Sequence, residues 1–105
     1  MINEQIQQII KASEADLIAM RRELHENPEL PWEEFETTKR IARELDKMGI
    51  EYRLTEPTGI IAEIKGGKAG KTVALRADID ALPVQELSDI PYKSKVEGKM
   101  HACGH

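Results

Sequence analysis

The chain has 105 residues, of which 40% are hydrophobic and 32% charged, and its formal net charge is −4. This length suits one globular domain at most. The acidic balance argues against nucleic acid as the main partner, no apolar run is long enough to cross a bilayer, and a single cysteine excludes an internal disulfide. Because Met1–Lys11 is polar and amphipathic, unlike a signal peptide, we expect a cytoplasmic location.

The first part of the chain is predicted to form two helices. Apolar residues recur at steps of three and four up to Leu24, and Pro28 disfavours helix at the residue before it. A second helix is expected from about Glu33, with an acidic first turn and Gly49 as its terminator. We expect its buried face to comprise Phe35, Ile41, Ala42, Leu45 and Met48.

After Gly49 the period of the pattern changes to that of strands. Ile50–Leu54 is a candidate short strand, Ile60–Ile64 reads as a largely buried strand, and Gly66–Gly70 as a loose hairpin loop. Thr72–Asp80 is predicted to be a further strand that alternates apolar and polar faces. Two helices followed by a hairpin or sheet indicate an α/β fold.

The last six residues hold the only cysteine and two of the three histidines. Cys103 and His105 are two residues apart, so in extended backbone their side chains share a face and could meet one metal ion. Two ligands do not complete a zinc site, and the remaining ones must come from elsewhere. A buried thiol and a solvated histidine are the alternative, and His101 is a weaker third candidate ligand.

Arg76, Asp78 and Asp80 place a cation and two carboxylates on one side of the predicted strand near its carboxyl end, where open α/β sheets bind ligands. These three residues could form an ion-pair cluster without chemistry. They could also support a metal site, because a carboxylate often orients a metal-bound histidine.

Three motifs occur in order along the chain: RELHENPEL at residues 22–30, RADIDALP at 76–83 and MHACGH at 100–105. Together they closely resemble the start of bacterial metal-dependent N-acyl-amino-acid amidohydrolases, which include aminoacylases and hippurate hydrolase and are related to carboxypeptidase-type metallopeptidases. The resemblance implies that Cys103 and His105 bind metal, with Asp78, Asp80 and Arg76 in support. His25 matches a family position that is not a ligand, and we expect it to be a hydrogen-bonded histidine closing the first helix.

The resemblance also implies that the chain is an incomplete catalytic domain. We expect residues 1–105 to be an N-terminal fragment of a catalytic domain, with the general-base glutamate, further ligands and a lid or dimerisation domain beyond His105. The complete enzyme would use two divalent ions, zinc or manganese, to hydrolyse the amide bond of N-acyl amino acids. We expect the fragment to be inactive and to self-associate through uncovered apolar surface. An interaction module without catalysis and a small metal-binding protein using His101, Cys103 and His105 remain alternatives.

Overall fold

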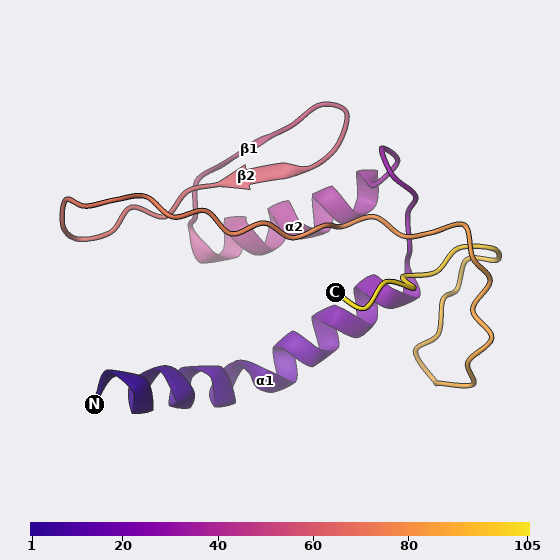
Figure 1. Ribbon diagram of the computed structural model, residues 1–105, viewed down its shortest axis with the longest axis horizontal. Coiled ribbons are helices and arrows are strands. Elements are labelled where there is room, and N and C mark those ends of the chain that lie inside the picture. Colours follow the sequence, from indigo (N-terminus) through magenta and orange to yellow (C-terminus); the bar gives the residue numbers. More distant parts are fainter.

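The computed structural model describes residues 1–105 and contains two helices and one small sheet (Figure 1). Helix α1 spans Ile2–Glu26 and helix α2 spans Phe35–Met48. Strand β1 (Tyr52–Leu54) pairs antiparallel with β2 (Ile60–Ala62), and Leu54 lies opposite Ile60. The predicted order of two helices and a hairpin is therefore confirmed. Neither helix is long and apolar enough to pass through a membrane.

Helix α1 ends where the sequence predicts. Asn27 leaves helical geometry with a ψ of 63°, and its side-chain amide donates to the carbonyl of Glu23 over 2.8 Å. Pro28 follows and cannot continue the helix. The end of α1 is thus fixed by a side-chain bond and a proline, which sets the direction of the turn into α2.

Helix α2 is capped from upstream rather than by its own acidic first turn. The carboxylate of Glu29 accepts the backbone N–H groups of Glu36 and Thr37 over 3.1 and 2.6 Å. It accepts hydrogen bonds from two of the N–H groups that every helix start leaves free. Its negative charge also interacts favourably with the positive end of the helix dipole. At the other end Gly49 adopts φ 68°, a left-handed conformation suited to glycine, and so confirms the predicted terminator.

The side chains buried at the start of α2 are mainly polar. Thr58 donates its hydroxyl to the carboxylate of Glu34 over 3.3 Å, and Thr38 Oγ1 accepts the N–H of Gly59 over 3.0 Å. Ala81 and Pro28 are the only buried apolar residues. The turn between β1 and β2 is therefore attached to α2 by hydrogen bonds instead of a large apolar core.

Several predicted packing relationships are wrong. Thr72–Asp80 is not a strand, because no second strand lies beside it, and only Ile60–Ala62 of the predicted Ile60–Ile64 strand is paired. Ile61, Phe35 and Met48, expected to be buried, are exposed. A two-stranded sheet offers no opposing layer, so these apolar side chains have little surface to pack against.

The carboxyl-terminal part of the chain returns to the end of α1. Ala81 N–H donates to the carbonyl of Glu29 over 2.7 Å, and Lys95 N–H donates to that of Glu26 over 2.9 Å. Leu82 and Met100 form an isolated antiparallel bridge. These bonds anchor both ends of the loop that precedes the terminal segment, residues 100–105.

Candidate metal centre

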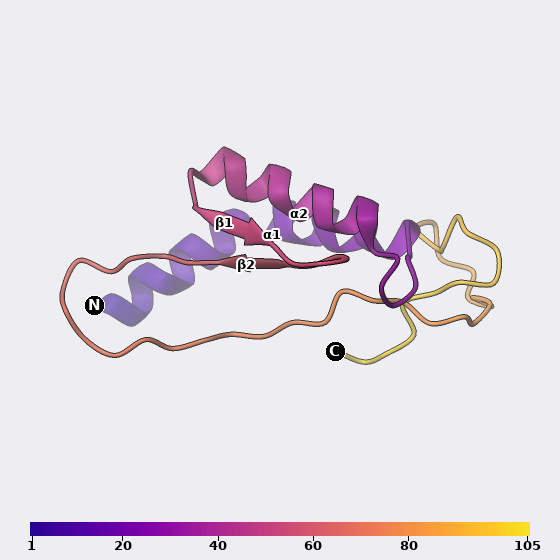
Figure 2. The ribbon, with the colours of Figure 1, turned by 90° about the horizontal axis from the view of Figure 1, so that it is seen from above.

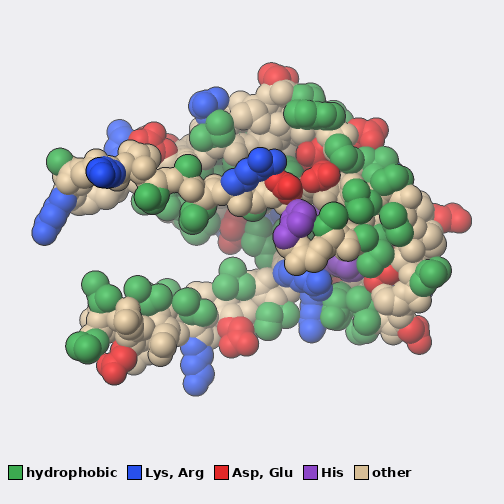
Figure 3. Space-filling model, in the orientation of Figure 1, with side chains coloured by type: hydrophobic (Ala, Val, Ile, Leu, Met, Phe, Trp, Pro, Cys, Tyr) green, Lys and Arg blue, Asp and Glu red, His purple; other side chains and the backbone are tan.

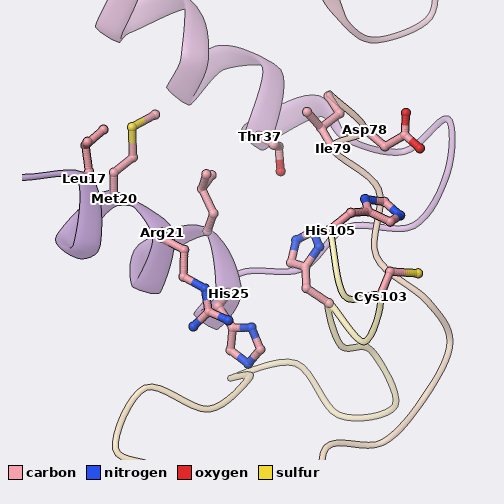
Figure 4. Close-up of a pocket in the computed structure, with 11 residues that line it drawn as sticks. Leu17, Met20, Arg21, His25, Thr37, Asp78, Ile79, Cys103 and His105 are labelled. Atoms are coloured by element: carbon pink, nitrogen blue, oxygen red, sulfur yellow. The ribbon is translucent and has the colours of Figure 1, made fainter. Parts of the chain in front are cut away.

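The terminal segment and helix α1 enclose a cavity of about 330 Å³ (Figure 4). Apolar residues of α1 form one wall, and polar residues from three distant segments form the rest. The lining residues are Leu17, Met20, Arg21, Leu24, His25, Thr37, Asp78, Ile79, His101, Cys103 and His105. All three histidines and the only cysteine of the chain therefore line one cavity.

The main chain brings two of the sequence motifs together. Leu82 N–H donates to the carbonyl of Met100 over 2.9 Å, and Met100 N–H donates back over 3.0 Å. This pair of bonds places the segment after Met100 beside the segment before Leu82. Cys103 and His105 follow the bridge in the chain and are exposed, and in Figure 4 both project toward the side of the view that Asp78 occupies.

Of the acidic motif, Asp78 reaches the cavity and Asp80 does not line it. Arg76 lies outside, and its Nε donates to the Asp78 carboxylate over 3.1 Å. The ion pair that the sequence left open as an alternative is thus present, and it joins Arg76 to an aspartate at the cavity. The backbone of Asp80 contributes differently, by accepting a hydrogen bond from His101.

A buried cluster of polar groups lies beneath the cavity. His25 Nε2 lies 2.9 Å from Oε1 of Glu86, and the same oxygen accepts the N–H of Ser94 over 2.8 Å. Ser88 donates its hydroxyl to Oε2 of Glu86. The bonds from Ser88 and Ser94, and then that with His25, lower the pKa of Glu86 against the opposing effect of burial. Glu86 is therefore a carboxylate that ties the end of α1 to the loop 86–94.

His101, in the terminal segment, lies beside His25 of this cluster. Its ring centroid is 6.5 Å from that of His25, and its Nε2 is buried without a hydrogen-bond partner. Burial lowers the pKa of His101, and the nearby His25 lowers it further, while the bond to the Asp80 backbone acts in the opposite direction. The net effect is a pKa of His101 below the usual value for a histidine.

The prediction for His25 is confirmed. His25 lies in the last turn of α1, is buried, and is hydrogen-bonded to Glu86. Its ring also meets that of Tyr92 edge-on, with the centroids 6.2 Å apart. His25 therefore holds the helix end against the returning chain, as a structural histidine does.

The arrangement offers two donors for a metal and no closed ligand set. No group of three or more His, Cys, Asp or Glu residues lies close enough to hold an ion. A thiolate and an imidazole suit zinc or another borderline transition metal better than magnesium. Cys103 and His105 line the same cavity, and together with His101 they do not form a three-ligand group.

Sequence reasoning missed Glu86 and the apolar wall of the cavity. Glu86 stands in a polar stretch, and nothing in its neighbourhood of the sequence distinguishes it from a solvated glutamate. Leu17 and Leu24 were part of the predicted apolar stripe, but a stripe does not reveal what it faces. Only the fold shows that this face of α1 borders the terminal segment.

Comparison with known proteins shows which family the chain is similar to. Residues 74–105 match the model of peptidase family M20/M25/M40. The chain is 52% identical to thermostable carboxypeptidase 2 of Saccharolobus solfataricus over 97% of its own length and 26% of the relative's. It is 57% identical to N-acetylcysteine deacetylase of Bacillus subtilis over 90% of its length and 26% of the relative's.

A solved structure agrees in fold. The Bacillus subtilis YXEP protein, a dinuclear metal binding peptidase from the M20 family, superimposes with a TM-score of 0.82 at 57% identity. The match covers 90% of this chain and 27% of that one. The chain thus spans about a quarter of the length of the relatives it matches.

Proposed function

Since this chain belongs to the M20 family of amidohydrolases and peptidases, over about a quarter of a member's length, we propose that Cys103 and His105 are metal ligands. Asp78 and Asp80 support them, and Arg76 orients Asp78. The observation that carries this proposal is that Cys103, His105 and Asp78 line one cavity although they come from two separate motifs.

The cation supported by this donor set is zinc, with manganese as the second candidate. Thiolate and imidazole are soft and borderline ligands, and they favour zinc over hard cations. The M20 relative of known structure is described as binding two metals. Two ions are therefore proposed for the whole protein, with the ligands that this chain lacks supplied outside residues 1–105.

The reaction that we propose for the whole protein is hydrolysis of the amide bond of N-acyl amino acids. Bound metal ions supply a water of lowered pKa and a Lewis acid for the acyl oxygen. In this chain, Cys103 and His105 would bind the metal as ligands. The carboxylate of Asp78 would be kept in position by Arg76. Names of relatives support this substrate class, since one is an N-acetylcysteine deacetylase and another a carboxypeptidase.

Within the whole protein, residues 1–105 are proposed to be part of the catalytic domain. They carry neither a general-base glutamate in the cavity nor a third ligand. The chain alone is therefore proposed to be inactive on N-acyl amino acids. A cytoplasmic location stays a prediction from the sequence.

We also propose that the chain self-associates. Large apolar side chains are exposed along the first half of α1 and along the segment after β2. Figure 3 shows hydrophobic side chains on both sides of the hollow between α1 and that segment. Surfaces of this kind generally bind a partner.

Calorimetric titration with zinc chloride tests the metal site. The wild-type chain should bind zinc, and Cys103→Ala or His105→Ala should weaken binding at least about 100-fold, because each removes a direct ligand. His101→Ala serves as the matched histidine control and should change affinity little. Equal loss in all three variants would instead indicate the small three-ligand site, and unchanged affinity in Cys103→Ala would overturn the proposal.

A further inference from the structure

The terminal segment makes few hydrogen bonds of its own. Residues 101–105 take part in no backbone–backbone hydrogen bond, and His101 bonds through its ring to the backbone of Asp80. Met100 is the last residue with a main-chain partner, Leu82. Figure 2 shows the chain passing from the loop after Leu82 into this segment. The place of the two candidate ligands therefore depends on how the chain enters Met100.

Residues 96–99 form a tight turn that leads into Met100. The N–H of Lys99 donates to the carbonyl of Val96 over 3.3 Å, and Gly98 adopts a φ of 76°. A positive φ at the third residue is what a type II turn requires, and glycine adopts it without strain. The turn thus sets the direction in which the chain enters its bridge with Leu82.

The hydroxyl of Ser94 joins the two ends of this turn. It donates to the carbonyl of Lys99 over 2.7 Å and accepts the N–H of Val96 over 3.1 Å. The carbonyl of Val96, 3.0 Å away, is a second acceptor within reach. One hydroxyl can bond both ends because it is a donor and an acceptor at once. Ser94 therefore fixes the residue that immediately precedes the terminal segment.

Ser94 is in turn attached to the buried carboxylate of Glu86. Its N–H donates to Oε1 of Glu86 over 2.8 Å, and the same oxygen bonds His25 at the end of α1. Glu86 is only 5% exposed, so water competes little for these bonds. A continuous series of hydrogen bonds runs from α1 through Glu86 and Ser94 to Lys99. All its members lie within residues 25–99, so it needs no partner from outside this chain.

We propose that Ser94 is a positioning residue for the metal centre. By fixing the turn 96–99, it keeps the terminal segment at the cavity before any metal binds. Ligands that are already in place bind a metal without a further cost of ordering. The inference rests on the proposed function, because this position matters for binding only if Cys103 and His105 are ligands. Ser94 itself touches neither, and it acts through the main chain of Lys99.

The position of Cys103 can be measured directly, because it is the only cysteine and is exposed. A nitroxide on Cys103 and a second on Glu14→Cys, at an exposed site of α1, give a distribution of distances by double electron–electron resonance on the metal-free chain. Ser94→Ala should broaden this distribution about twofold, since the carbonyl of Lys99 and the N–H of Val96 lose their partner. Ser94→Thr keeps the hydroxyl and should restore the narrow distribution.

Ser88→Ala is the matched control. Ser88 donates to the same carboxylate of Glu86 and makes no bond to the turn, so its removal should leave the distribution unchanged. Gly98→Ala tests the turn by another route. No atom lies within 4 Å of the Cβ that it would add, so only the φ of 76° opposes the new side chain. This variant should broaden the distribution as Ser94→Ala does, and circular dichroism confirms that each variant keeps its helices.

Broadening in Ser94→Ala and Gly98→Ala, with Ser94→Thr and Ser88→Ala like the wild type, is the expected result. An unchanged distribution in Ser94→Ala would overturn the proposal. Equal broadening in Ser88→Ala would also overturn it, in favour of the Glu86 cluster as a whole. Should Ser94→Ala lose its helices, Gly98→Ala decides alone. Since no metal is present, these results are independent of whether the terminal segment supplies ligands, which the zinc titration decides.

Discussion

His25 Nε2 lies 2.9 Å from Oε1 of Glu86, although 61 residues separate them in the sequence. Both side chains are buried, and their bond joins the last turn of α1 to the loop that precedes the ligand segment. Because Ser88 and Ser94 donate to the same carboxylate, Glu86 accepts bonds from three directions. The contact therefore determines how the terminal segment lies against α1.

Removal of the histidine from this contact is expected to destabilise the fold. His25→Ala leaves the Glu86 carboxylate short of one bond and should lower the free energy of unfolding by about 1 to 3 kcal/mol. Urea unfolding followed by circular dichroism measures the change. Lys11→Ala, on an exposed part of α1, should stay within about 0.5 kcal/mol. Equal stability of the His25 variant and the wild type would show that the contact carries no stability.

The same contact predicts an acid-sensitive part of the stability. The pKa of Glu86 is lowered in the folded chain, first by Ser88 and Ser94 and then by His25. The folded state thus binds this proton less tightly than the unfolded state does. The resulting stabilisation is complete above the unfolded pKa of about 4.5 and is lost as the pH falls through the lower folded value.

Comparison of the wild type with Glu86→Gln isolates that contribution. From pH 6 downward past pH 4, the wild type should lose stability more steeply than the variant, and the difference between them should shrink. Glu97→Gln changes the same charge at an exposed position and should run parallel to the wild type. A constant difference at all pH values would contradict the assignment.

The cap of α2 gives a third prediction. Glu29 accepts the N–H groups of Glu36 and Thr37, so Glu29→Ala should destabilise the chain by about 0.5 to 2 kcal/mol. Glu33→Ala removes an exposed carboxylate just before the same helix and is the control. If the two variants lost equal stability, general charge at the helix start, and not this cap, would be responsible.

The helices were predictable from sequence because their signals are local. Pro28 and Gly49 act through their own backbone conformations, and both mark an element end in the structure. Thr72–Asp80 was not predictable, because its alternating pattern specifies a strand only when a neighbouring strand accepts its hydrogen bonds. Within residues 1–105 that neighbour is absent.

The candidate site was predictable only in part, for the same reason. The candidate ligands Cys103 and His105 stand out by residue type alone. The approach of Asp78 to them depends on the Leu82–Met100 bridge, and the role of Glu86 depends on a contact with α1. Such relationships arise between distant segments, and no single stretch of sequence contains them.

The supporting role of Asp78 is testable through metal affinity. Asp78→Asn should weaken zinc binding about tenfold, as expected when a carboxylate that orients a ligand is neutralised. Arg76→Ala should have a smaller effect, since it acts through Asp78. Asp89→Asn, an exposed aspartate of the loop, provides the matched control in the same titration. An Asp78 variant with wild-type affinity would remove this residue from the site.

We propose that one thiolate and one imidazole of the terminal segment bind the same metal ion. X-ray absorption at the zinc edge of the zinc-loaded chain tests it most directly. We expect one sulfur at about 2.3 Å together with nitrogen or oxygen ligands at about 2.0 to 2.1 Å. A first shell of oxygen and nitrogen alone would contradict it.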